Sequence, residues 1–115
     1  MEDLRSRTKR FALRIIKLYV SLPKSTEAQV SGKQALRSGA SVGAHCREGT
    51  RARSTAEFAS KLGGAQQELE ETAYWLELLG DSGIVKATKL ADLLTEIDEL
   101  GKILTTCIKN AKDRE

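Results

Sequence analysis

The chain has 115 residues, of which 40% are hydrophobic, 30% charged and 4% aromatic, with a single proline. These values exclude a disordered chain and are not typical of β-sandwiches or barrels, so we expect one all-α domain over residues 1–115. No apolar run reaches the roughly 20 residues that a membrane span needs, and the N-terminus lacks a signal-peptide pattern, which predicts a cytoplasmic protein without membrane contact.

Charge is divided unevenly between the two halves of the chain. Residues 1–61 hold 13 Lys and Arg against 5 Asp and Glu, a net charge of +8, whereas residues 62–115 hold 6 against 11, a net charge of −5. This division can mark a basic surface for nucleic acid or for an acidic partner. It can also mark two halves that attract each other within the fold or between subunits, and both interpretations stay open.

The first predicted helix runs from Leu4 to Leu22. Its seam repeats at alternating spacings of four and three residues, which is typical of a helix in a bundle. The seam consists of Leu4, Thr8, Phe11, Ile15, Leu18 and Leu22. Pro23 ends the helix, because proline lacks the amide N–H and disfavours a helical conformation in the residue before it.

The second predicted helix runs from about Glu27 to Ala52, and Thr26 with Gln29 forms a possible capping box at its start. One side gathers small and apolar residues: Ala28, Gly32, Ala35, Leu36, Gly39, Val42, Gly43 and Cys46. Each glycine costs a helix roughly 1 kcal/mol relative to alanine, so we expect these glycines to allow another helix to approach closely. Four basic residues return to the opposite side, within roughly 80° of each other at 100° per residue: Lys33, Arg37, Arg47 and Arg51.

Two further helices follow. Ser54 and Glu57 form a second capping box, and the seam after them consists of Phe58, Leu62, Ala65, Leu69, Thr72, Leu76 and Leu79. Gly80 and Gly83 end that helix. A fourth helix, starting near Thr88, has the seam Leu90, Leu94, Ile97, Gly101, Leu104, Ile108 and Ala111. The short connections make neighbouring helices antiparallel, which predicts an up-down-up-down four-helix bundle.

Several apolar residues lie away from these seams: Leu13, Ile16 and Val20 in the first helix, and Trp75 and Leu78 in the third. One bundle core cannot easily bury both sets of apolar positions, so we expect these five residues to form an interface between subunits. The alternative is that tilted helices bury them within one protomer.

The basic residues of the first half are the candidates for binding nucleic acid: Arg10, Arg14, Lys17, Lys33, Arg37, Arg47, Arg51, Arg53 and Lys61. Each could neutralise one phosphate. Because no aromatic residue is interleaved with them, we expect recognition of duplex DNA or structured RNA by shape rather than by base stacking. The alternative is that Arg37, Arg47 and Arg51 pair with acidic residues of the third or fourth helix, within the bundle or across a subunit contact.

Nothing in the sequence favours catalysis, a cofactor or a metal. Glu68, Glu70 and Glu71 lack a matched base, nucleophile or metal set, so we expect no enzyme. His45 and Cys46 adjoin each other, but neighbouring helical positions diverge by about 100° and do not easily serve one metal ion. Cys46 and Cys107 are expected to be reduced thiols.

The stretch Gly32–Ala44, followed by Arg47-Glu48 and Arg51–Ser54, resembles the four-helix-bundle family encoded in bacterial 23S rRNA intervening sequences. The resemblance extends over nearly the whole chain, through Phe11-Ala12, Ala56-Glu57-Phe58, Lys61-Leu62-Gly63, Glu68–Thr72 and Tyr74-Trp75-Leu76.

The resemblance implies a homo-oligomer, expected to be a pentamer, and a kinship with the accessory variability determinant of diversity-generating retroelements. That relative is a basic pentamer that binds nucleic acid and works with a reverse transcriptase. Together these observations lead to the hypothesis of a non-catalytic adaptor that binds nucleic acid electrostatically. The alternative is a structural or protein-interaction module whose basic half pairs with an acidic partner or a neighbouring subunit.

Overall fold

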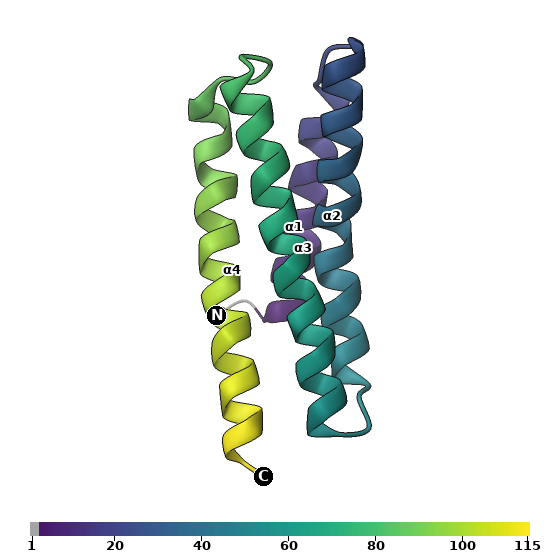
Figure 1. Cartoon of the computed structure of the whole chain (residues 1–115), viewed down its shortest axis with the longest axis vertical. Helices are drawn as coiled ribbons and strands as arrows, with labels where there is room; N and C mark the ends of the chain where they lie inside the picture. The colour runs from purple at the N-terminus through teal and green to yellow at the C-terminus, as the bar shows by residue number, and fades with distance from the viewer. Residues whose placement is uncertain (1–2) are drawn as a thin grey trace.

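The computed structural model describes residues 3–115 and shows four helices packed side by side in an elongated bundle of 49 × 21 × 20 Å (Figure 1). The helices are α1 Leu4–Val20, α2 Thr26–Thr50, α3 Thr55–Asp81 and α4 Ala87–Asp113. The described residues contain no strand, so the prediction of an all-α four-helix bundle is confirmed.

The helices do not contact one another equally. The contact between α2 and α3 is the most extensive, α1 packs mainly on α2, and α4 packs mainly on α3. Contact between α1 and α4 is sparse. In Figure 1, α3 lies in front and α1 behind it, and the shorter α1 leaves the lower end of the bundle to the other three helices.

Of the two predicted capping boxes, the one at Ser54 is confirmed in its N-cap hydrogen bond. The hydroxyl of Ser54 accepts a hydrogen bond from the backbone N–H of Glu57 at 3.1 Å. The prediction for Thr26 is wrong: Ser25 is the N-cap residue, and its side chain makes no capping hydrogen bond. The side chain of Gln29 is used differently, because it donates to the carbonyl of Pro23 at 2.8 Å and accepts from the hydroxyl of Tyr19 at 2.9 Å. Gln29 thereby fastens the turn between α1 and α2.

The glycines of α2 allow close contact with α1, as the sequence predicts. A Cβ at Gly39 would lie 2.9 Å from Cγ1 of Ile15, and a Cβ at Gly43 would lie 3.2 Å from Oγ1 of Thr8. Leu22, which lies just beyond the end of α1, is buried and occupies the space beside Gly32. The backbones of α1 and α2 therefore lie closer together than larger side chains would permit.

The buried face of α4 is rotated from the predicted one. Leu93 and Leu100 are buried although neither belongs to the predicted seam, whereas Leu94, Gly101 and Ile108 are only partly buried. The rotation also turns Glu96 toward α1, where its carboxylate meets the guanidinium of Arg7. This contact between α1 and α4 explains why a charged position faces inward.

None of the helices within residues 3–115 has the length and hydropathy that a membrane crossing requires.

Candidate nucleic-acid interface

The outer face of α2 carries the four basic residues that the sequence placed on one side. All four side chains are exposed, and the opposite side of the helix is buried against α1 and α3. The four are Lys33, Arg37, Arg47 and Arg51. They differ in whether a carboxylate of the same chain forms an ion pair with them.

Arg37 has such partners. Its Nη1 lies 3.3 Å from Oε2 of Glu68, and its Nη2 is bonded to the carboxylate of Glu71. Glu71 also accepts a hydrogen bond from the indole N–H of Trp75 at 3.0 Å. The bonds from Trp75 and Arg37 lower the pKa of Glu71, which keeps the carboxylate charged. Arg37 therefore behaves as the internal salt-bridge interpretation expects.

Lys33, Arg47 and Arg51 differ, because none of them forms an ion pair with any residue in the described range 3–115. Arg47 lines a shallow groove of about 290 Å³ between α1 and α2, together with Lys9. The floor of the groove is made of small residues: Thr8, Ala12, Ala40, Gly43 and Ala44.

Lys9 was missed among the sequence candidates. Lys9 directly follows the seam residue Thr8 and lies three residues before Ala12, and this could have marked Lys9 as a residue at the edge of the buried face. The groove gives Lys9 and Arg47 a common surface with no acidic residue in its lining.

The three candidate nucleic-acid-binding residues on α1 lie in two different environments. Arg10 and Arg14 lie close enough to Glu96 for their charges to help lower its pKa, although the hydrogen bond from Arg7 contributes most. Lys17 is exposed and forms no ion pair with a described residue. Arg10 and Arg14 thus belong to the contact between α1 and α4 rather than to the α2 face.

The remaining candidates, Arg53 and Lys61, lie just before α3 and in its second turn. Arg53 is exposed in the turn between α2 and α3. Nζ of Lys61 is 3.7 Å from Oε1 of Glu48, and the same oxygen is 3.3 Å from Nδ1 of His45. The geometry at His45 does not make a hydrogen bond, so Nδ1 has no hydrogen-bond partner in the described chain. The imidazole packs on Gly64, where a Cβ would lie 3.0 Å from Nδ1.

The candidate interface residues differ in exposure. Leu13, Ile16 and Val20 are 54%, 42% and 72% exposed. Trp75 and Leu78 are partly buried, and Trp75 also packs against the core of its own protomer.

Tyr74, which is not among the predicted interface residues, is 54% exposed and meets the ring of Trp75 edge to face, with centroids 5.1 Å apart. Its position one residue before Trp75, on the outer side of a seam of period 3.6, was the available signal.

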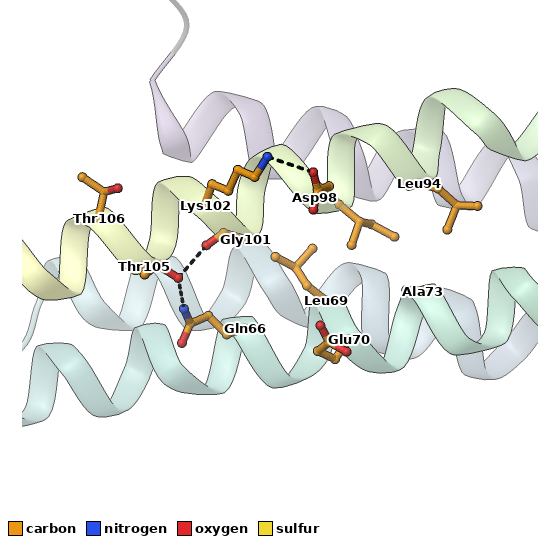
Figure 2. A pocket seen from close by; sticks show the side chains of 11 residues that line it. Gln66, Leu69, Glu70, Ala73, Leu94, Asp98, Gly101, Lys102, Thr105 and Thr106 are labelled. Carbon is orange, nitrogen blue, oxygen red and sulfur yellow. Dashed lines mark hydrogen bonds and ion pairs between the residues drawn. The ribbon is translucent and has the colours of Figure 1, made fainter.

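A groove of about 630 Å³ lies between α3 and α4, and Figure 2 shows side chains of both helices along it. The amide of Gln66 donates to the hydroxyl of Thr105 at 2.8 Å across the groove, and Lys102 pairs with Asp98 at 3.2 Å. Glu70 adds a carboxylate to the lining. These acidic groups disfavour a phosphate, so the groove does not extend the basic face.

The two cysteines do not form a redox pair in this fold. Burial raises the pKa of Cys46 to about 11, which disfavours its reactive thiolate form. No Cα of α2 lies within 8 Å of a Cα of α4, which places Cys46 and Cys107 beyond the Cα separation of roughly 4.4–6.8 Å that a disulfide spans. Residues 3–115 hold no cluster of three or more side chains suited to a metal ion.

Comparison with known proteins supports the resemblance seen in the sequence. The model of a family described as 23S rRNA-intervening sequence protein matches residues 3–106. A crystal structure of a protein of unknown function from the S23 ribosomal protein family of Bacteroides thetaiotaomicron VPI-5482 is 37% identical, with a TM-score of 0.87. The match covers 93% of this chain and 99% of that one. No curated protein matches the chain.

Proposed function

The chain belongs to the 23S rRNA-intervening sequence protein family, and we propose that it is a non-catalytic, homo-oligomeric adaptor that binds the phosphate backbone of nucleic acid through the outer face of α2. The observation that carries the proposal is that Lys33, Arg47 and Arg51 share this face and have no carboxylate partner in the described fold. Such cations can take phosphates as their counterions.

The length of this face suits a duplex. Lys33 and Arg51 are separated by 18 residues of helix, which corresponds to about 27 Å at 1.5 Å per residue. A duplex of that length contains roughly eight base pairs at 3.4 Å each. Contacts to phosphates position the backbone without reading its sequence. The preferred ligands are therefore duplex DNA or structured RNA.

The exposed aromatic side chain does not change this preference. Tyr74 and Trp75 lie beside Glu71, a residue whose charge repels phosphate, and not beside the unpaired cations. Base stacking on these rings is thus disfavoured, which separates the proposal from the usual mode of single-strand binding.

Assembly forms part of the same proposal. The family resemblance implies a pentamer. A homo-oligomer would repeat the basic face of α2 several times and raise the effective affinity for nucleic acid. We place this activity in the cytoplasm, with a reverse transcriptase or another nucleic-acid enzyme as the class of protein partner.

A second candidate function, protein interaction, is favoured by one observation. The ion pairs of Arg37 with Glu68 and Glu71 show basic and acidic segments of this chain attracting each other within the fold. An acidic partner protein could use the remaining cations in the same way.

The test compares two double variants with the same change in net charge. Arg47→Gln/Arg51→Gln removes two unpaired cations, whereas Arg37→Gln/Lys61→Gln removes two that already face carboxylates. Fluorescence anisotropy with labelled duplex DNA and structured RNA, measured from 50 to 200 mM salt, gives the affinity and its salt slope.

We expect Arg47→Gln/Arg51→Gln to weaken binding at least tenfold and to reduce the salt slope by about 1.8, or about 0.9 for each phosphate that is no longer neutralised. The control should change the affinity less than about threefold. Absence of binding by the wild type at 50 mM salt, or equal losses in both variants, would overturn the proposal and favour the protein-interaction function.

A further inference from the structure

The basic outer face of α2 contains one residue of the opposite charge. Glu48 is the only acidic residue between Lys33 and Arg51. At 100° per residue, Glu48 lies about 20° from Arg37 and about 60° from Arg51 around the helix axis. Its side chain is 51% exposed. A carboxylate in this position repels the phosphates that the cations of the face attract, so the partners of Glu48 affect the affinity of the whole face.

Two side chains meet the same carboxylate oxygen of Glu48. Nζ of Lys61, on α3, lies 3.7 Å from Oε1, and Nδ1 of His45, one turn earlier on α2, lies 3.3 Å from it. A lysine ammonium is charged at neutral pH, whereas an imidazole is charged only after it takes up a proton. Glu48 therefore has one partner of constant charge and one partner whose charge depends on pH.

The packing of α2 on α3 holds the imidazole of His45 in this position. The ring lies on Gly64, where a Cβ would be 3.0 Å from Nδ1 and 3.1 Å from Cε1. Nδ1 is buried and has no hydrogen-bond partner among residues 3–115, which is a costly state for a polar atom. A proton on Nδ1 turns this atom into a donor, and the exposed carboxylate of Glu48 needs only a small rotation to accept from it. The charge of the imidazolium strengthens that bond.

The other charged groups near the imidazole are mostly cations. They are Arg47 and Arg51 on α2 and Lys61 on α3. Glu68, four residues after Gly64 on α3, is a second carboxylate, but it pairs with Arg37 at 3.3 Å. The cations oppose proton uptake by His45 while the face is empty. This opposition falls when phosphates neutralise Arg47 and Arg51.

We propose that His45 regulates the basic face of α2 by pH: on taking up a proton it binds the carboxylate of Glu48, and Lys61 is released to contact phosphate. The inference rests on the proposed function of this face. The net charge of the three side chains rises from zero to +1. Because histidine changes its charge between pH 5 and pH 8, the face should hold nucleic acid more tightly at the acidic end of this range.

The coupling between the proton and nucleic acid has to be reciprocal. If protonation of His45 strengthens binding, binding must in turn promote the uptake of a proton. Isothermal titration calorimetry at pH 7, in two buffers that differ in ionisation enthalpy, measures this uptake. We expect the wild type to take up a fraction of a proton for each chain that binds duplex DNA, and His45→Gln to take up none.

The affinity test compares the wild type with His45→Gln at pH 5.5 and pH 8. The sequence contains a single histidine, and the control keeps every other titratable group, including both cysteines and the N-terminal amine. Fluorescence anisotropy with labelled duplex DNA, from 50 to 200 mM salt, measures the affinity, and circular dichroism verifies that both chains are folded.

We expect the wild type to bind at least threefold more tightly at pH 5.5 than at pH 8, which is the order of effect of one added charge near a phosphate in water. Its salt slope should be steeper by up to about 0.9 at pH 5.5, because Lys61 neutralises one more phosphate. His45→Gln should have the same affinity at both pH values. Equal pH dependence in the two chains would overturn the proposal.

Glu48→Gln tests whether the effect passes through the carboxylate. This variant leaves Lys61 without its partner at every pH, so it should bind at pH 8 as tightly as the wild type does at pH 5.5. Most of the pH dependence should be lost, because the remaining cations oppose protonation of His45. An imidazole that acts only as one more cation would keep the full pH dependence in Glu48→Gln, and that result would contradict the proposal.

NMR on the free protein separates this inference from the proposed function. As the pH falls, the carboxyl carbon of Glu48 and Nζ of Lys61 should shift together with Cε1 of His45, and neither should shift in His45→Gln. An imidazole that titrates without a response of Glu48 would overturn the inference. Linked shifts in a wild type that binds no nucleic acid at either pH would confirm the exchange at Glu48 and refute the proposed function alone.

Discussion

α1 is attached to the bundle on its two sides by different physical means. Toward α2 the contact is steric, with Ile15 packed directly on Gly39. Toward α4 the contact is sparse and ionic: Nη2 of Arg7 lies 2.7 Å from Oε1 of Glu96 and 3.0 Å from Oε1 of Glu99. A steric contact depends on side-chain volume and is indifferent to pH, whereas an ionic contact depends on the protonation of its carboxylates.

The largest effect is expected at the steric contact. In Gly39→Val, the Cβ would lie 2.9 Å from Cγ1 of Ile15, and two further methyl groups would need space in the same place. Because this overpacking involves a buried, branched side chain, we expect the free energy of unfolding to fall by about 3 kcal/mol in urea denaturation at pH 7. The loss should be the same at pH 4.

Gly63→Ala is the control for Gly39→Val. A Cβ at Gly63 would have no heavy atom within 4 Å, so only helix propensity changes. We expect a gain of up to about 1 kcal/mol. If Gly39→Val were as stable as the wild type, the steric account of the α1–α2 contact would be wrong.

A smaller effect, with a pH dependence, is expected at the ionic contact. Glu96→Gln removes the charge that Arg7 binds at 2.7 and 2.8 Å, in a side chain that is 9% exposed. We expect a loss of about 2 kcal/mol at pH 7, in line with hydrogen bonds to charged groups.

The sign of the pH dependence follows from the pKa of Glu96, which the bond from Arg7 lowers below its ordinary value of 4.5. The folded state therefore gains stability from this carboxylate above pH 4.5 and loses it as the pH falls through the lowered pKa. Urea denaturation between pH 7 and pH 3 should show the difference between wild type and Glu96→Gln shrinking toward zero. A difference that stays constant over this range would contradict the ionic account.

The smallest effect is expected at an arginine–carboxylate ion pair that is more exposed to solvent than the pair of Arg7 with Glu96. Arg37 pairs with Glu68 and Glu71 as Arg7 pairs with Glu96, but the side chain of Arg37 is 50% exposed and that of Arg7 is 21% exposed. We expect Arg37→Gln to cost less than about 1 kcal/mol, because water and salt screen exposed pairs. Denaturation in 0.5 M NaCl should remove most of this loss, and a salt-independent loss of about 2 kcal/mol would contradict the argument.

The parts of the fold that depend on local patterns could be predicted from the sequence. The seam of α1 and the glycine side of α2 identified the buried residues, and Ser54 marked the start of α3. The buried face of α4 was harder to predict. Leu93 and Leu100 compete with Leu94 and Gly101 for the core, and the choice depends on how α4 turns toward Arg7, which is 89 residues from Glu96 in sequence.

The candidate site was predictable to a similar extent. Periodicity placed Lys33, Arg37, Arg47 and Arg51 on one exposed side of α2. Periodicity could not predict which of the four are paired with a carboxylate, because the partners of Arg37 come from another helix, 31 and 34 residues away in sequence. Lys9 joined Arg47 only when α1 and α2 packed together.

The sequence by itself determined four helices, their approximate ends, the face that α2 buries and the family to which the chain belongs. These follow from interactions within a few residues, such as the 3.6-residue period, the conformational limits of proline and the low volume of glycine. Only the tertiary structure decided which cations keep an unpaired charge and that Tyr74 rather than Trp75 is the exposed aromatic residue, because both depend on the side chains that neighbouring helices bring within contact distance.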